Sequence, residues 1–363
     1  MVSYLNNIEK MKYKFGILKN ENKNSHKKWE NACKHYQLDY TIIDLTKCNW
    51  LEKIQNQEFD CFLLQPPGVI ARFKNLYDER LYILCKILGY KTFPSYEEVV
   101  LHENKKLLSY FLNAKKIPHP NTFVFYFKKE ALEFLLRTNY PLVGKSSNGA
   151  GGTGVKILKN YKDAKKYVQR AFSDKGLTKK SGPNFKTGNI PKRVLKKLAN
   201  IKEAREKIKS YIDIASDAQK GFVILQEYVP HDFEWRSVRI GDSYFAHKKI
   251  KQGDMASGTK GIDYINPPEA LLDFTKKICE ENNFNFMAID LFENQNGGYL
   301  VNELQTIFGH VQDYILEVDG QPGRYLYINN QWQFEKGDFN SNESYNLRLK
   351  FVIQLLKNNQ PWS

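Results

Sequence analysis

The sequence lacks any run of 18 apolar residues, which excludes an ordinary transmembrane helix. The stretch from Met1 to Lys14 has no apolar core, because polar residues such as Asn6, Asn7 and Glu9 interrupt it. We therefore expect no secretory signal and no membrane span. Cysteine is scarce as well: the five cysteines are an odd number, lie far apart, and include no pair with zinc-ligand spacing. This usage is typical of reduced proteins, so we predict free thiols, mostly buried, and a cytoplasmic location.

Acidic residues are outnumbered. The chain has 55 Lys and Arg against 40 Asp and Glu, and its formal net charge is +15. Such a balance favours anionic partners, among them nucleotide phosphates, acidic small molecules, an anionic polymer or nucleic acid. We do not expect nucleic acid, because the basic residues lack the interleaved aromatic residues of a single-strand binding platform.

Enough apolar residues are present to fill a large core. With 363 residues, 42% of them hydrophobic and 14% aromatic, the chain is long enough for two or three domains. Short apolar runs at Tyr13 to Leu18, Tyr40 to Leu45 and Phe59 to Leu64 alternate with helical patterns. One of these, Leu76 to Leu88, should end at Gly89. We therefore predict an α/β domain with a parallel sheet over residues 1–94.

A second domain is predicted over residues 95–316. Its first part should contain a helix at Asn104 to Ala114 and strands at Thr122 to Phe127, Pro141 to Lys145 and Val155 to Leu158. Further strands, bounded by Gly, Pro, Asn or Asp, are expected to form one antiparallel sheet. They are Val223 to Tyr228, Ser237 to Ile240, Tyr244 to Lys248, Met287 to Phe292 and Tyr299 to Leu304.

Two segments stand apart from this pattern. Residues 171–221 hold 13 Lys or Arg against 5 Asp or Glu, which indicates a basic, mostly helical insertion. It is either a solvated helix face or a surface for an anionic acceptor. Residues 317–363 form a C-terminal extension with a predicted hairpin and a final helix from Tyr345 to Leu356. We expect the aromatic residues of the hairpin to pack against the N-terminal layer.

A glycine-rich loop joins two of the predicted strands. Four glycines fall within the six residues from Gly149 to Gly154, so the backbone N–H groups could wrap phosphate oxygens without obstruction by a Cβ atom. The loop is not a Walker loop, because it lacks the Gly-Lys-Ser or Gly-Lys-Thr ending. Taken alone, the pattern fits either a phosphate-binding loop or a flexible turn.

A pair of carboxylates is predicted on a hairpin. Asp290 and Glu303 lie on strands joined by the turn Asn296-Gly297-Gly298, so the strands should pair and bring the two side chains together. Gln305 shares a strand face with Glu303, because side chains alternate with period two. Two buried like charges are costly without a cation between them, and Mg²⁺ favours a few carboxylates with phosphate oxygens and water. The alternative is two surface carboxylates on a hairpin.

In this order along the chain, the motifs from Glu103 to Gly309 resemble the ATP-grasp superfamily, and in particular the glutathione synthetase and ribosomal-protein glutamate ligase groups. The matching pieces are Asn104-Lys105, Ile117-Pro118-His119-Pro120, Val143-Gly144-Lys145 with the glycine loop, Leu225 to Val229, Glu234-Trp235-Arg236, Ala288-Ile289-Asp290 and Asn302 to Gln305. The resemblance implies an α/β (α+β) ATP-grasp fold with an N-terminal Rossmann-like pre-ATP-grasp domain. It also implies ATP and Mg²⁺ as cofactors, with Mn²⁺ as a substitute.

The resemblance assigns roles residue by residue. ATP would be bound by phosphate-contacting lysines, by the glycine loop, by the hinge that contacts adenine and by an acidic residue beyond it. These residues are Lys105, Lys145, Gly149, Gly151, Gly152, Gly154, Gln226, Glu227, Tyr228 and Glu234. Asp290, Glu303 and Gln305 would hold the metal, and Arg236 with Lys248 or Lys249 would neutralise the transferring phosphoryl group. Gln305 and Glu234 stand where relatives commonly have Asn and Asp, and Met255 where relatives have an arginine.

The implied function is an ATP-dependent carboxylate–amine ligase that works through an acyl phosphate. Its partners would be ATP and small-molecule or peptide substrates, one a carboxylate and one an amine, and the protein would be a monomer or homodimer. The alternative is an ATP-grasp phosphotransferase acting on a hydroxyl or a phosphorylated sugar. The two lone histidines near the site, His247 and His310, are expected to be structural.

Overall fold

The N-terminal layer is a four-stranded parallel sheet. The computed structural model describes residues 13–149, 152–179, 201–252, 255–256, 261–294, 296–310 and 312–358. The sheet order is β2-β1-β3-β4, with β1 at Lys14–Lys19, β2 at Asp39–Asp44, β3 at Cys61–Leu64 and β4 at Thr92–Phe93. The predicted parallel sheet is therefore confirmed.

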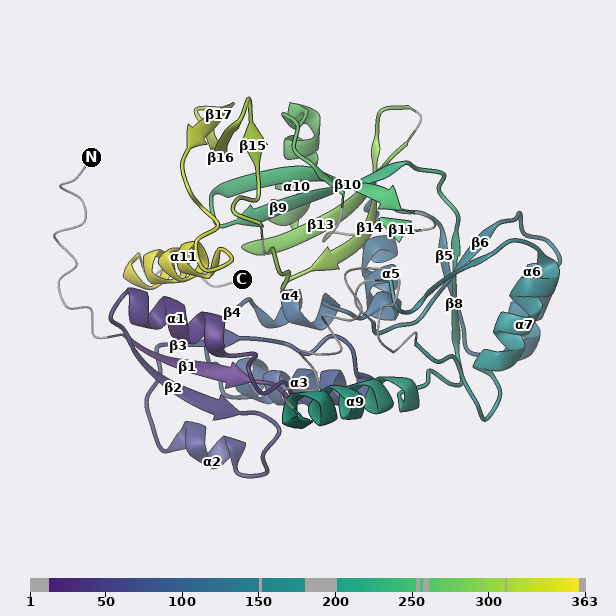
Figure 1. Ribbon diagram of the computed structural model, residues 1–363, viewed down its shortest axis with the longest axis horizontal. Coiled ribbons are helices and arrows are strands. Elements are labelled where there is room, and N and C mark those ends of the chain that lie inside the picture. Colours follow the sequence, from purple (N-terminus) through teal and green to yellow (C-terminus); the bar gives the residue numbers. More distant parts are fainter. Residues whose placement is uncertain are drawn as a thin grey trace.

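The helices of this layer connect its strands (Figure 1). They are α1 (Lys27–His35), α2 (Trp50–Gln55), α3 (Ala71–Tyr82) and the π-helix η1 (Ile83–Ile87). The predicted helix at Leu76 to Leu88 starts five residues earlier, at Ala71. Its first buried residue is Lys74, a charged side chain that an apolar pattern does not reveal. It ends as expected before Gly89, which has a positive φ of 70°.

A second, antiparallel sheet carries the glycine loop. Its order is β5-β8-β6-β7, with β5 at Thr122–Phe125, β8 at Val223–Glu227, β6 at Leu142–Lys145 and β7 at Val155–Leu158. Helices α6 (Lys128–Leu135) and α7 (Tyr161–Ala171) cover one side of it in Figure 1. The expectation that β8 belongs to one sheet with the later strands is wrong. Both edges of β8 are already paired, with β5 and with β6.

The largest sheet is antiparallel and nine-stranded. Its main path is β14-β13-β9-β10-β16-β15, with β11, β12 and β17 attached at its side. These strands are β9 (Phe233–Ile240), β10 (Ser243–Gln252), β11 (Met255–Ala256), β12 (Ile262–Asp263), β13 (Phe286–Glu293), β14 (Tyr299–Gln305), β15 (Glu317–Val318), β16 (Gln321–Ile328) and β17 (Gln331–Lys336). The predicted C-terminal hairpin is β16–β17, and it extends this sheet.

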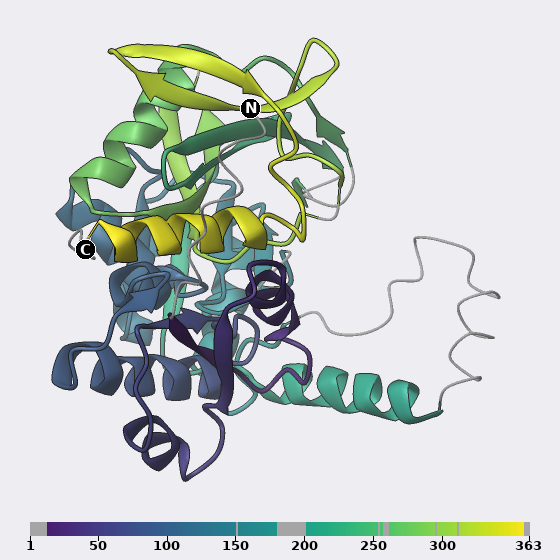
Figure 2. The ribbon, with the colours of Figure 1, turned by 90° about the vertical axis from the view of Figure 1, so that its left-hand side faces the viewer.

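The remaining helices join these units. They are α4 (Tyr96–Leu101), α5 (Lys105–Ala114), α9 (Ile201–Ser216), α10 (Glu269–Glu281) and α11 (Tyr345–Lys357). Asn104 caps α5 by accepting a hydrogen bond from the backbone of Leu107, so Lys105 stands in the first turn. In Figure 2, α9 extends outward from the body of the molecule. Among the described residues, no helix combines the length and the apolar character needed to cross a membrane.

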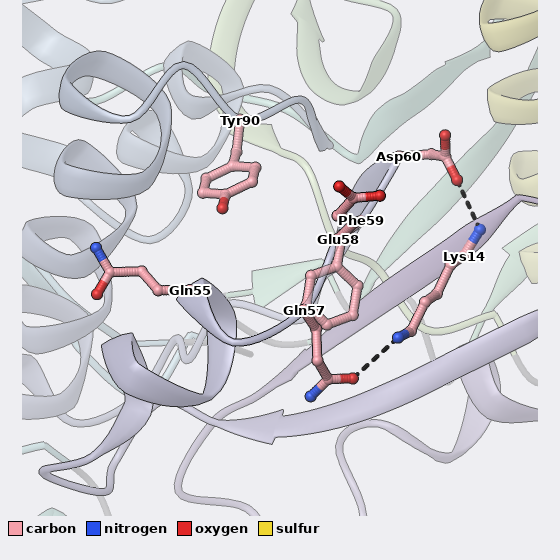
Figure 3. A pocket seen from close by; sticks show the side chains of 7 residues that line it. All are labelled: Lys14, Gln55, Gln57, Glu58, Phe59, Asp60 and Tyr90. Atoms are coloured by element: carbon pink, nitrogen blue, oxygen red, sulfur yellow. Dashed lines mark hydrogen bonds between the residues drawn. The ribbon is translucent and has the colours of Figure 1, made fainter.

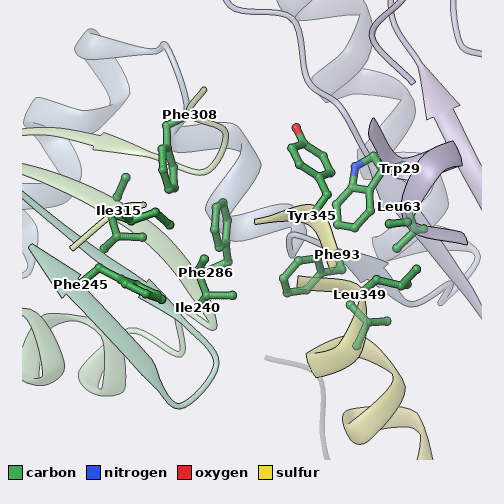
Figure 4. Close-up of a cluster of buried hydrophobic side chains, with 14 of the residues drawn as sticks. Trp29, Leu63, Phe93, Ile240, Phe245, Phe286, Phe308, Ile315, Tyr345 and Leu349 are labelled. Atoms are coloured by element: carbon green, nitrogen blue, oxygen red, sulfur yellow. The ribbon is translucent and has the colours of Figure 1, made fainter. Parts of the chain in front are cut away.

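The N-terminal layer and the largest sheet share one hydrophobic core. Trp29 packs on Phe93 and on Tyr345 of α11, and Phe93 packs on Phe286 from β13 (Figure 4). The aromatic residues of the hairpin pack elsewhere than expected. Trp332 packs edge-on against Tyr244 of β10 and donates a hydrogen bond to Asp273 of α10, because β16 pairs with β10. The segment that packs on the N-terminal layer is α11, against α1.

Candidate active site

The predicted carboxylate pair is brought together. Asp290 of β13 and Glu303 of β14 face each other directly in the strand register, and both are largely buried. A β-bulge follows, so that Leu291 pairs with Val301 and Asn302 is the extra residue. The bulge turns the Asn302 side chain toward the same cluster, where its Oδ1 accepts a hydrogen bond from Lys145 at 2.8 Å.

Asp290 is held by two cations. Arg236 of β9 donates to its two oxygens at 2.8 and 2.9 Å, and Lys249 of β10 donates to Oδ2 at 2.7 Å. Burial alone would raise the pKa of Asp290, but the charges of Arg236 and Lys249 outweigh burial and hold it well below its usual range. Lys249 also contacts Glu234 Oε2 at 2.7 Å. The carboxylate is therefore ionised, and it is fixed in one orientation.

Glu303 is held by Lys105 at the start of α5. The ammonium lies 2.8 Å from Glu303 Oε1 and 3.1 Å from Glu103, and it donates to the carbonyl of Gly149 at 3.0 Å. Burial opposes ionisation of Glu303, yet Lys105 lowers its pKa overall. Gln305 points its amide nitrogen at Glu303 (2.9 Å), and its amide oxygen accepts from Arg236 at 3.2 Å. As placed, Gln305 contacts both Glu303 and Arg236, and its role as a metal ligand remains a prediction.

Lys145 ends β6 directly before the glycine loop. It is 7% exposed, and burial lowers its pKa to about 8, although Glu303 nearby acts in the opposite direction. Its partner in the structure is a neutral amide oxygen of Asn302. Among the four basic side chains of the cluster, Lys145 is thus the one whose ammonium has no carboxylate oxygen of the described residues within 4.0 Å.

The glycine loop approaches this cluster through tight backbone turns. Gly152 has a φ of +72°, and a Cβ atom on Gly154 would lie 2.7 Å from that of Ser146, so neither position favours a side chain. The loop is anchored at its start, where Ser147 N–H donates to Gln219 and Asn148 donates to the carbonyl of Glu103. Gly151 lies outside the described residues.

The predicted hinge lies where the chain leaves β8 for the largest sheet. Gln226 is buried and donates to Thr122 at 2.8 Å, while Glu227 accepts from Asn121 at 3.0 Å. The hydroxyl of Tyr228 accepts from Lys251 at 3.2 Å. These contacts tie the hinge to both sheets. The role of its backbone toward adenine remains a prediction.

The two adjacent lysines of β10 point to opposite faces of the sheet. Lys249 enters the cluster, whereas Lys248 stacks over the rings of Phe233 and Trp235, at 3.9 and 5.1 Å from their centroids. The structure therefore does not bring Lys248 to the other predicted site residues. His247 shares the cluster face with Lys249. Burial, with His310 beside it, lowers the pKa of His247 to about 3, and its Nδ1 donates to the carbonyl of Ile315.

Two residues of the cluster, and one residue beside the glycine loop, have no role that the sequence predicts. Asn302 belongs to a matching motif, but its inward orientation depends on a bulge that the pattern does not reveal. Glu103 begins the resembling region, and it is 3% exposed with a left-handed φ of 49°. Gln219 lies in the basic segment, and nothing in the sequence connects it with the glycine loop. An acidic residue next to an N-cap asparagine was the one available signal for Glu103.

The donor set can be tested against Mg²⁺ and ATP. Within the described part of the chain, no three His, Cys, Asp or Glu side chains gather as a metal site. Two ionised carboxylates in register are what the cluster offers, and Mg²⁺ bound to a nucleotide takes its other ligands from phosphates and water. In the present arrangement four basic residues are balanced against four acidic ones: Lys105, Lys145, Arg236 and Lys249 against Glu103, Glu234, Asp290 and Glu303. Phosphates could replace the carboxylates as partners of the cations, and a metal could take the carboxylates, so that each buried charge keeps a partner of opposite sign. The residues therefore fit the group.

Two surface hollows among the described residues lie away from this cluster. One is a polar hollow at the N-terminal layer, of about 860 Å³, lined by residues such as Lys14, Phe59 and Tyr90 (Figure 3). The other, of about 560 Å³, lies among β9, β10, α10, β16 and α11. Neither is lined by the residues that the sequence predicts for the site. The candidate site is therefore assigned from its charged side chains.

Comparison with known proteins places this geometry in a known fold. No model of a protein family matches the chain. Over 230 residues it is 22% identical to the alpha-aminoadipate–LysW ligase LysX of Saccharolobus solfataricus, which covers 62% of this chain and 68% of LysX. D-alanine–D-alanine ligase from Bacillus anthracis superposes with a TM-score of 0.55 at 12% identity, over 96% of this chain and 98% of its own. The D-cycloserine synthetase DcsG gives a TM-score of 0.52 at 14% identity, over 81% and 91%.

Proposed function

We propose that this chain, which has the ATP-grasp fold of the structures it resembles, is an ADP-forming carboxylate–amine ligase. The observation that carries the proposal is the cluster around Asp290 and Glu303. It joins two ionised carboxylates in register to four basic side chains beneath a glycine loop. Such a cluster suits the transfer of a phosphoryl group, which depends on neutralised charge and positioning. No nucleophilic side chain is required.

In the proposed reaction a substrate carboxylate oxygen attacks the γ-phosphorus of ATP. An O–P bond forms, the bond to ADP breaks, and an acyl phosphate results. An amine nitrogen then attacks the acyl carbon; the C–N bond forms, the C–O bond to phosphate breaks, and the amine loses a proton. Bound Mg²⁺ would neutralise charge on the phosphates, with Asp290 and Glu303 as its protein ligands. Lys105 and Lys145 would bind phosphate oxygens, and Arg236 with Lys249 would face the transferring group.

The glycine loop serves in this proposal as a cover that keeps water from the acyl phosphate. Ser147 and Asn148 fix its first residues to the body of the protein. The hinge at Glu227 and Tyr228 would contact adenine, and Gln305 would orient Glu303. The proposal also includes the predicted domain limits, a cytoplasmic location, and a monomeric or homodimeric state.

A phosphotransferase is the alternative. The three relatives cited above are named ligases or synthetases, which favours the ligase. The test is an unbiased screen of acids and amines for ADP release by the purified protein. A ligase releases phosphate only when acid and amine are both present, whereas a kinase leaves a stable phosphorylated product. Asp290→Asn should abolish turnover, and turnover that persists in this variant would contradict the assignment.

A further inference from the structure

Part of the basic segment forms a strap that touches both the glycine loop and the N-terminal layer. The strap consists of residues 177–179 and 213–219, which are joined to each other by the backbone pair of Leu177 and Gln219. Leu177 N–H donates to the carbonyl of Gln219 at 2.8 Å, and Gln219 N–H donates back at 3.0 Å. Two backbone hydrogen bonds therefore hold the two pieces together.

One end of the strap holds the glycine loop. The side-chain oxygen of Gln219 accepts from Ser147 N–H at 2.7 Å, and its amide nitrogen donates to the carbonyl of Phe222. The carbonyl of Ser147 in turn accepts from the backbone of Lys105 at 2.9 Å. Gln219 thus contacts Ser147, and Ser147 is bonded to the start of α5, where Lys105 is a predicted phosphate ligand.

The other end holds the segment that follows β3. The ammonium of Lys179 donates to the carbonyl of Val69 and to Asp217, and Asp217 accepts from Ala71 N–H at 2.9 Å. Lys179 is 5% exposed, so this is a buried, charge-assisted contact that has few alternative partners. Arg72 adds an ion pair to Asp213 at the end of α9, 3.5 Å away.

The position of the second contact matters for substrates. Ligands of open α/β sheets bind beyond the carboxyl ends of parallel strands, and residues 65–70 follow the carboxyl end of β3. The strap therefore joins the edge at which a substrate is expected to the loop expected over the phosphates. A strap that only stabilised the fold would not need to contact the glycine loop.

We propose that Lys179 and Gln219 are positioning residues that couple the glycine loop to the segment 65–72, so that nucleotide binding orders the substrate edge. The proposal rests on the ATP-binding function proposed above. Its coupling runs through two side chains with known contacts. Removing either should leave nucleotide binding intact and weaken the communication between the two regions.

Hydrogen exchange of the full-length chain, with and without Mg-ATP, tests the coupling. In the wild type we expect ATP to slow exchange in residues 146–149 and also in residues 65–72. Lys179→Met should keep the first effect and reduce the second by about fivefold or more, a typical size for coupling between sites. Gln219→Leu should reduce it as well. Lys175→Met is the matched control, since Lys175 is exposed on the same segment and should behave as the wild type.

The outcomes separate the two proposals. If ATP protects neither region of the wild type, the proposed function fails. If ATP protects residues 146–149 but not 65–72, or if both variants keep the full effect at 65–72, the strap does not couple the regions. Thermal unfolding checks that each variant is folded. Should Lys179→Met be unfolded, Gln219→Leu decides the question alone, because the side chain it loses makes two uncharged hydrogen bonds.

Discussion

At the scale of single residues, the site consists of buried ion pairs that would exchange partners when Mg²⁺ and ATP bind. Each carboxylate that a metal would take is occupied by a cation: Asp290 by Arg236 and Lys249, and Glu303 by Lys105. Breaking one buried pair leaves an unpaired charge and is costly, whereas exchanging all the partners at once is not. Mg²⁺ and ATP should therefore bind more strongly together than separately.

Lys145 gives this cluster a predictable pH dependence. Its pKa of about 8 means that the free protein loses this charge as pH rises through that value. We expect the affinity for ATP to fall above pH 8, by up to about tenfold per pH unit, since kcat/KM and binding report the free protein. Lys145→Arg should remove the fall near pH 8, because arginine stays protonated. An unchanged pH profile in this variant would contradict the role of Lys145.

The lowered pKa of Lys145 also makes the free energy of unfolding depend on pH. The unfolded value is about 10.4, so between about pH 8 and 10.4 the unfolded state binds more protons than the folded state. The contribution of Lys145 to the free energy of unfolding should therefore rise with pH across this window. Urea titrations of the wild type and Lys145→Gln at several pH values measure the difference.

Much of the site could be predicted because its motifs are local. The pairing of Asp290 with Glu303 follows from two apolar strands around one turn. The alternation of side chains along a strand does not decide whether Lys248 or Lys249 faces the site. That depends on the register between β10 and β9, in which Lys249 pairs with Glu234. Alternation also misplaces Asn302, because it puts this side chain on the face opposite Glu303. Only the β-bulge turns Asn302 to the same face.

At the scale of elements, the glycine loop is the part whose backbone shape matters most. Its turn at Gly152 needs a left-handed φ, which costs a residue with a Cβ atom roughly 1–2 kcal/mol. We predict that Gly152→Ala weakens ATP binding about tenfold, because the loop would move away from the phosphates. Titration with a fluorescent ATP analogue measures the loss.

Gly297 is the matched control for this change. It lies in the β13–β14 turn with a φ of +75° and open space around its Cα, so alanine there meets the same backbone strain away from the cluster. Gly297→Ala should lower stability as Gly152→Ala does and leave the affinity for ATP unchanged. Equal losses of affinity in both variants would mean that strain, and not loop shape, causes the effect.

Most elements could be predicted because each has a clear local pattern, but their assembly could not. The strand at Val223 has the same apolar composition as the later strands, yet it pairs with β5 and β6, which lie far before it in the sequence. The aromatic residues of the β16–β17 hairpin were expected on the N-terminal layer and pack on β10 and α10 instead. Long-range pairing of this kind leaves no signal within a strand.

At the scale of the whole molecule, the N-terminal layer and the largest sheet are joined by one shared hydrophobic core. Phe286 lies at its centre, fully buried, with ring centroids 6.0 Å from Phe93 and 5.9 Å from Phe308. The guanidinium of Arg348 covers its ring at 4.3 Å. A boundary between residues 94 and 95 therefore crosses a core that the two predicted domains share, while each of them also has a buried cluster of its own.

We predict that Phe286→Ala lowers the free energy of unfolding by about 3–5 kcal/mol. Because the core is shared, the N-terminal layer and the largest sheet should unfold together, in one transition at a lower denaturant concentration. Fluorescence and far-UV circular dichroism during urea titration measure this. Leu136→Ala, at a side chain that is 70% exposed, should change little. Two separated transitions in the wild type would contradict the shared unit.

The measurement that tests the account most directly is calorimetric titration with ATP, with Mg²⁺ and with EDTA. We predict tight binding to the wild type with Mg²⁺ and markedly weaker binding without it. In Asp290→Asn and Glu303→Gln this difference should disappear, because the carboxylates that would hold the metal are gone. Equal affinity of the wild type with and without Mg²⁺, or an unchanged Mg²⁺ dependence in both variants, would contradict the assignment of Asp290 and Glu303.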